Sequence, residues 1–154
     1  MFLATAPAAP DVDQLLQSDV ADGGYVMNLT RAWAWRADLA TGFATVRRQL
    51  MLRSRLDRRD WVIAACACAS TAGDSYCSLS FGNVLTALID APTAAALLRG
   101  EAPATLTPRE LAIVAWARKV ARHPNATTAA DAGALRAVGL RDKEIFELTA
   151  FVAF

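Results

Sequence analysis

Asp74-Ser75-Tyr76-Cys77, four consecutive residues at the boundary between two expected helices, have the types and spacing best suited to chemistry. The spacing is that of a Cys-x-x-Cys redox motif in which an aspartate holds the place of the first cysteine. A thiol peroxidase needs a thiolate, a group that moves its proton, and a second thiol that resolves the sulfenic acid as a disulfide. A helix N-terminus favours a thiolate through its dipole, whereas the carboxylate of Asp74 disfavours it. The stretch therefore predicts a thiol redox site whose chemistry is impaired.

Each of these side chains also has a purely structural interpretation. Asp74 is either a helix N-cap, which we favour, or an acid/base group in a pocket. Cys77 is either a reactive thiol or an inert buried one, the more common state of a cysteine. Cys66 and Cys68 are two residues apart, so they point to different faces of a helix. We expect both of them in the core rather than in a metal or redox pair.

The single histidine, His123, limits the other chemistry open to the chain. One histidine argues against a Ser/His/Asp triad and against a histidine-rich metal site. The sequence therefore predicts no metal and no cofactor. Three cysteines are an odd number and argue against a disulfide framework, and the N-terminus has no basic segment typical of a signal peptide. We expect a cytoplasmic protein.

The elements that must position these residues are predicted to be helices. Asp57 and Asp60 are typical of a helix start, and Gly73 of its end. Thr107 and Glu110 form a capping box with a proline at the first helical position. Period-two alternation, which indicates strands, is lacking. Helices are expected over 11–21, 29–35, 37–51, 57–72, 75–89, 92–99, 107–123, 128–138 and 142–154. The fold class is all-α, a single-domain helical bundle, with a flexible segment 1–10 before a helical domain 11–154.

Several stretches, together with the layout of the turn, carry a resemblance that covers most of the chain. They are Gly24-Tyr25-Val26-Met27-Asn28-Leu29, Leu106-Thr107-Pro108-Arg109-Glu110-Leu111-Ala112, Ala117-Arg118-Lys119-Val120-Ala121-Arg122 and Val138-Gly139-Leu140-Arg141-Asp142-Lys143-Glu144-Ile145. From about Gly24 onward, the chain resembles the carboxymuconolactone decarboxylase or alkylhydroperoxidase-D-like (AhpD-like) family, in its peroxidase-related branch. The resemblance implies the AhpD-like helical bundle.

The resemblance also implies roles for individual positions. In the family the turn reads Cys-x-Tyr-Cys, a histidine follows the second cysteine by four residues, and a glutamate precedes the first by about twelve. Here those positions hold Asp74, Cys77, Phe81 and Val62. The implied protein is peroxidase-related but lacks the thiol-peroxidase relay, with Cys77 as the candidate catalytic residue. The alternative is an active oxidoreductase, such as an alkylhydroperoxidase-like antioxidant, or a decarboxylase-like enzyme, using a cleft around Asp74, Tyr76 and Cys77.

A small-molecule ligand would bind beside this turn, with Asp74, Tyr76 and Phe81 as candidate binding residues. Residues four apart share a helix face, so Cys77 and Phe81 should be neighbours. The carboxylate of Asp74 favours a neutral or weakly polar ligand over a dianion. The alternative is that Phe81 fills the volume that the relay would have used, so that no pocket remains.

Composition sets limits on the partners. A length of 154 residues suggests one domain, and a net charge of +1 argues against nucleic acid and anionic membranes as partners. The longest charge-free stretches, 62–73 and 75–89, are shorter than the roughly 20 residues that a membrane span needs. A hydrophobic content of 55% and a mean hydropathy of +0.26 predict that apolar surface meets another subunit. The resemblance implies a homo-oligomer, a trimer or a hexamer, and a monomer in light scattering would contradict it.

Overall fold

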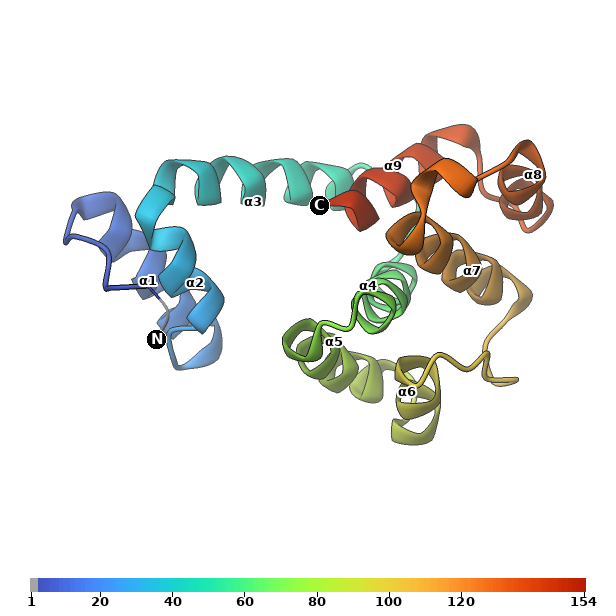
Figure 1. Cartoon of the computed structure of the whole chain (residues 1–154), viewed down its shortest axis with the longest axis horizontal. Helices are drawn as coiled ribbons and strands as arrows, with labels where there is room; N and C mark the ends of the chain where they lie inside the picture. The colour runs from blue at the N-terminus through green and yellow to red at the C-terminus, as the bar shows by residue number, and fades with distance from the viewer. Residues whose placement is uncertain (1–2) are drawn as a thin grey trace. The chain divides into compact units, whose positions relative to one another are not determined.

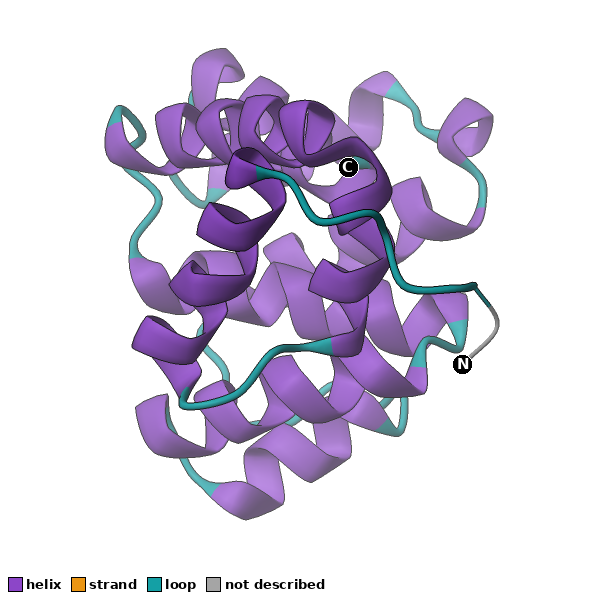
Figure 2. Ribbon diagram, turned by 90° about the vertical axis from the view of Figure 1, so that its left-hand side faces the viewer, coloured by secondary structure: helices purple, strands orange, loops and turns teal. Residues whose placement is uncertain are grey.

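A computed structural model of the protein describes residues 3–154, which form helices joined by short loops (Figure 1). These residues contain no strand (Figure 2), which confirms the all-α prediction. The α-helices are α1 (Pro10–Gly23), α2 (Asn28–Trp33), α3 (Ala37–Leu52), α4 (Arg58–Ala72), α5 (Ser75–Leu88), α6 (Ala91–Leu98), α7 (Pro108–Arg122), α8 (Ala129–Ala137) and α9 (Asp142–Ala153), and the 3-10 turns are η1 (Ala34–Arg36) and η2 (Pro124–Ala126).

The stop and start signals in the sequence place the helix boundaries well. Every predicted helix is present, and its ends lie within about two residues of those expected. The predicted helix 29–35 ends early, because α2 ends at Trp33 and the tighter turn η1 then carries the chain into α3. Local capping rules therefore account for most of the secondary structure of this chain.

The chain folds into two compact units, one ending at Leu52 and the other formed by Arg53–Phe154. The predicted division into a flexible segment 1–10 and a domain 11–154 stays a prediction, and residues 1–2 of that segment lie outside the described residues. All of the predicted site residues belong to the second unit.

The first unit packs α1, α2 and α3 around small side chains. Its buried core consists mainly of alanines, which allow helices to approach closely. The indole of Trp35 adds a hydrogen bond. Trp35 donates a hydrogen bond from Nε1 to the carbonyl oxygen of Ala4 at 3.1 Å. The core residues are Ala6, Val12, Ala34 and Ala37, with Ala9, Leu15 and Leu16 packed against them.

The second unit is built around α4. The middle of this helix is apolar on every side, a pattern typical of a central helix. The helix contacts α5, α6, α7 and α9 (Figure 1). Even so, none of the helices within residues 3–154 combines the length and the apolar character that a membrane crossing requires. The buried residues of α4 are Asp60, Trp61, Val62, Ile63, Ala64, Ala65, Cys66, Ala67 and Ala69.

A sharp turn joins α4 to α5 and positions the candidate redox residues. Gly73 ends α4 with a left-handed backbone (φ 71°), a conformation that favours glycine. Asp74 then has an extended backbone, and α5 begins at Ser75. The turn is thus fixed by a glycine stop followed directly by a capping residue.

Candidate functional site

Asp74 and Cys77 come together in this turn through a helix cap. Asp74 is the N-cap of α5, and its Oδ1 accepts a hydrogen bond from the backbone N–H of Cys77 at 3.0 Å. An N-cap side chain satisfies an amide at the start of the helix, which has no partner within the helix. The interpretation of Asp74 as a cap is therefore confirmed, and the cap itself brings the carboxylate to the cysteine.

The electrostatics of this pair oppose thiolate chemistry. The pKa of Asp74 is lowered, first by the hydrogen bond from the backbone N–H of Cys77 and then by a hydrogen bond from the Cys77 side chain. Asp74 is therefore an anion at neutral pH. A carboxylate beside a thiol disfavours a second negative charge there.

The other predicted positions differ in their surroundings. Tyr76 is exposed on the first turn of α5, with 43% of its surface accessible. Phe81 is half-buried and packs against the core of the second unit, and Val62 is buried within that core. Neither the phenyl ring nor the isopropyl group can transfer a proton, so the two relay positions of the motif contribute packing. A ligand cleft formed with Tyr76 and Phe81 stays a prediction.

The two cysteines of α4 are core residues, as expected. Cys66 is fully buried, and burial raises the pKa of its thiol to about 12. Cys68 is half-buried and donates a hydrogen bond from Sγ to the carbonyl oxygen of Val152 at 3.6 Å. Its pKa is also raised, by burial and by the charge of Asp74. Both thiols therefore stay protonated at neutral pH and are poor nucleophiles.

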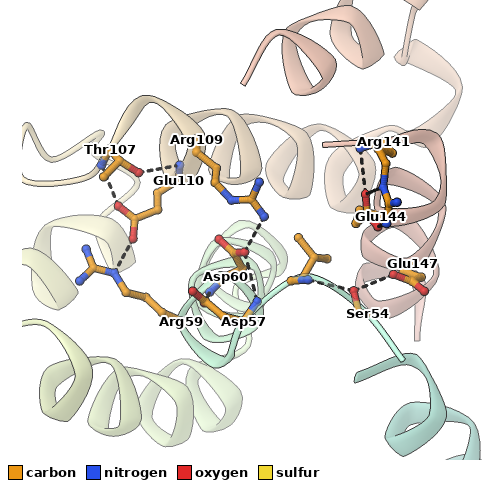
Figure 3. Close-up of polar contacts among 11 residues, drawn as sticks. Ser54, Asp57, Arg59, Asp60, Thr107, Arg109, Glu110, Arg141, Glu144 and Glu147 are labelled. Atoms are coloured by element: carbon orange, nitrogen blue, oxygen red, sulfur yellow. Dashed lines mark hydrogen bonds and ion pairs between the residues drawn. The ribbon is translucent and has the colours of Figure 1, made fainter. Parts of the chain in front are cut away.

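A second group of polar side chains, which sequence analysis did not assemble, lies where the N-terminal turns of α4 and α7 meet (Figure 3). Arg109 of α7 donates from Nη2 to Oδ2 of Asp60 on α4 at 2.9 Å. Arg59 of α4 pairs in return with Glu110 of α7. Each helix thus supplies an arginine and an acid, and two ion pairs cross the same interface.

The capping boxes position both acids. The Oδ2 of Asp60 accepts a hydrogen bond from the backbone N–H of Asp57 at 3.3 Å, in addition to the one from Arg109. Glu110 likewise accepts from the backbone N–H of Thr107 at 2.7 Å. Each acid is the third residue of its helix and follows an arginine. This repeated arginine–acid pair after a cap was the signal in the sequence from which the ion pairs could have been found.

A polar pocket of about 290 Å³ lies beside this network. Its charges are mostly matched within the protein, as Glu144 illustrates: Arg141 donates to it from its backbone N–H, Nε and Nη2 at 2.6–2.9 Å. Burial alone would raise the pKa of Glu144. The hydrogen bonds from the Arg141 side chain, and then the one from its backbone, lower this pKa to about 2. The two ion pairs therefore join the starts of α4 and α7, whereas Arg141 and Glu144 pair within the start of α9 itself. The pocket is lined by Arg55, Asp57, Asp60, Arg109, Gly139 and Glu144.

The low pKa of Glu144 predicts how stability depends on pH. A carboxylate whose pKa is lowered by folding stabilises the native state above its ordinary pKa of 4.5, and this contribution is lost as the pH falls toward about 2. The free energy of unfolding, measured by urea denaturation, should therefore fall across this window, and by less in Glu144→Gln. Asp142→Asn removes an exposed carboxylate instead, whose ion pair with Arg136 is screened by solvent, and should keep the wild-type pH dependence. An unchanged pH dependence in Glu144→Gln would contradict the assignment.

Solved structures with the same arrangement of helices give an independent view of the fold. An uncharacterized peroxidase-related protein from Silicibacter sp. TM1040 superposes with a TM-score of 0.88 at 24% sequence identity, covering 100% of this chain and 82% of that chain. The alkylhydroperoxidase AhpD core of an uncharacterized peroxidase-related protein from Ralstonia eutropha JMP134 gives a TM-score of 0.82 at 23% sequence identity. This match covers 97% of this chain and 82% of that chain.

A third match adds a protein with a different activity. A cysteine-to-alanine variant of the debrominase Bmp8, in complex with 2,3,4-tribromopyrrole, superposes with a TM-score of 0.76 at 19% identity, covering 99% of this chain and 83% of that chain. No protein-family model and no curated protein sequence matches the chain. At these identities the structural matches establish the fold, and this all-α chain therefore has the AhpD-like fold shared by peroxidase-related proteins.

Proposed function

We propose that this protein is a member of the AhpD-like family, in its peroxidase-related branch, that has kept the helical fold without the dithiol peroxidase relay. One observation carries the proposal: a carboxylate, Asp74, stands in the place of the first thiol and accepts hydrogen bonds from the amide and side chain of Cys77. A carboxylate cannot form or resolve a disulfide, and its charge disfavours the thiolate that would attack a peroxide.

The surroundings of the motif support the same proposal. The family's histidine and glutamate positions hold Phe81, which packs against the core, and Val62, which is buried within it. A thiol peroxidase needs a general base near its thiol. Cys66 and Cys68 do not offer a substitute nucleophile, because burial raises the pKa of both thiols.

A peroxidase assay tests the proposal. Consumption of cumene hydroperoxide, with dithiothreitol as the reductant, should proceed no faster with the protein than in buffer containing the reductant alone. Cys77→Ser, which removes the motif thiol while keeping a side chain of similar size, should give the same rate. Consumption that depends on the protein and is abolished by Cys77→Ser would contradict the proposal.

The second candidate is an active oxidoreductase or decarboxylase-like enzyme using the surface around Asp74, Tyr76 and Cys77. Hydroperoxide consumption that depends on Cys77 would support the oxidoreductase. The observation in its favour is accessibility: Asp74 and Tyr76 are exposed, and Cys77 is only half-buried. The debrominase with the same fold indicates that this architecture can serve reactions other than peroxide reduction. Asp74 would then act as an acid/base group as well as a cap.

We also propose self-association into a trimer or hexamer and a cytoplasmic location. Large apolar side chains on the second unit support self-association: Leu79 on α5 and Phe146 on α9 each expose about two thirds of their surface. Burying such side chains against another copy removes apolar area from water. The odd number of cysteines supports a reducing compartment. Light scattering distinguishes a monomer from either assembly.

A further inference from the structure

A second, larger pocket lies along the C-terminal half of α7, away from the polar network of Figure 3. Its volume is about 470 Å³, within the range of small-molecule sites. Its lining combines cationic side chains with alanines, so a ligand there would meet both charge and apolar surface. The lining residues are Ala115, Arg118, Lys119, Arg122, His123 and Ala126.

The positive charges of this pocket are not all matched. Lys119 donates from Nζ to Oδ2 of Asp131 on α8 at 2.6 Å, so its charge is neutralised. Arg118 instead donates from Nη2 to two backbone carbonyl oxygens, those of Leu97 at 3.0 Å and Glu101 at 2.8 Å. The carboxylate of Glu101 pairs with Arg99. Arg118 is therefore held in place by groups that leave its charge uncompensated.

Arg122 adds a second uncompensated guanidinium. It lies four residues after Arg118, on the same face of α7, and within the described residues its side chain has no hydrogen-bond or ion-pair partner. The two cations repel each other: the pKa of Arg118 is lowered by burial and by the charge of Arg122. An anion between them would remove this repulsion. The carbonyl end of α7 carries about half a negative charge, too little to balance two full positive charges.

We propose that this pocket binds a small organic anion, with its carboxylate or phosphate group between Arg118 and Arg122 and its apolar body over Ala115 and Ala126. Guanidinium groups suit this role because their planar donors match the oxygens of carboxylates and phosphates. The fixed position of Arg118 reduces the entropy lost on binding. The pocket beside Arg109 is a weaker candidate, because its arginine and acids already pair with one another.

Calorimetric titration with defined probes tests the proposal. Phenyl phosphate and benzoate carry the two anionic groups on the same ring, benzyl alcohol is the neutral control, and inorganic phosphate lacks the apolar body. At low ionic strength, at least one of the two organic anions should bind more tightly than benzyl alcohol and inorganic phosphate. The tighter of the two identifies the anionic group. Arg122→Gln should weaken that binding about tenfold or more, since it removes a charged hydrogen-bond donor.

Two further variants separate a specific site from general effects. Arg48→Gln on α3 makes the same change of net charge at an exposed arginine elsewhere, and it should leave binding unchanged. Ala115→Phe fills the apolar side of the pocket while keeping both arginines, and it should also weaken binding. Circular dichroism confirms that each variant is folded. The proposal is overturned if neither organic anion binds, if benzyl alcohol binds equally well, or if Arg122→Gln and Arg48→Gln have equal effects.

Discussion

Arg109→Gln is expected to lower the free energy of unfolding of this protein by about 3 kcal/mol. The variant leaves the carboxylate of Asp60, whose side chain is only 6% exposed, without its arginine partner. Removing one member of a buried ion pair is strongly destabilising, because the remaining charge has lost both water and its partner. The value lies at the low end of the usual range because Arg109 is itself one third exposed, so water can reach part of the site. The loss in the free energy of unfolding can be measured by urea denaturation, with circular dichroism as the signal.

Arg136→Gln is the matched control for this prediction. It removes the same group from an ion pair with Asp142, at 2.6 Å, in which both side chains are more than half exposed. Exposed pairs contribute little, so the loss should stay below about 1 kcal/mol. Adding Asp60→Asn to Arg109→Gln removes the stranded charge and should recover part of the stability. Equal losses of unfolding free energy in Arg109→Gln and Arg136→Gln would show that the ion pairs between α4 and α7 do not stabilise this interface.

Asp74→Cys is expected to give a protein that forms a disulfide between position 74 and Cys77 on mild oxidation. The Asp74 side chain already reaches the amide and the side chain of Cys77, and a cysteine at the cap position would start from the same backbone. Removing the carboxylate also removes the charge that disfavours the Cys77 thiolate. Mass spectrometry and thiol titration of the unfolded protein should both show the loss of two thiols relative to the reduced protein.

Asp74→Ser is the control, because serine keeps an N-cap oxygen but supplies no sulfur. It should lose no thiols under the same oxidation. Full thiol retention in Asp74→Cys would contradict the assignment of Asp74 to the first position of the motif.

Adding Phe81→His and Val62→Glu to Asp74→Cys would then rebuild the relay positions and test whether hydroperoxide turnover follows. The glutamate is the costly change, since Val62 is only 8% exposed and a buried carboxylate needs a partner. Phe81→His should therefore be added first.

The sequence alone was enough to predict the helices and the cap at the candidate turn. Asp57 with Asp60, Thr107 with Glu110, and Gly73 followed by Asp74 act through hydrogen bonds between residues close in the chain. Such signals depend on local backbone geometry, which the sequence specifies directly. The same locality explains why Asp74 could be predicted to cap the helix that carries Cys77.

Tertiary structure decided which charges are matched. Asp60 meets Arg109 from 49 positions away, and Lys119 meets Asp131 on another helix, whereas the neighbouring Arg118 meets only carbonyl groups. These outcomes depend on how α4 packs against α7, and how α7 packs against α8, through apolar faces that many sequences could supply. Short stretches of sequence are thus enough to determine the helix caps. The ion pairs between α4 and α7 and the unmatched arginines depend instead on how helices distant in the sequence pack against one another.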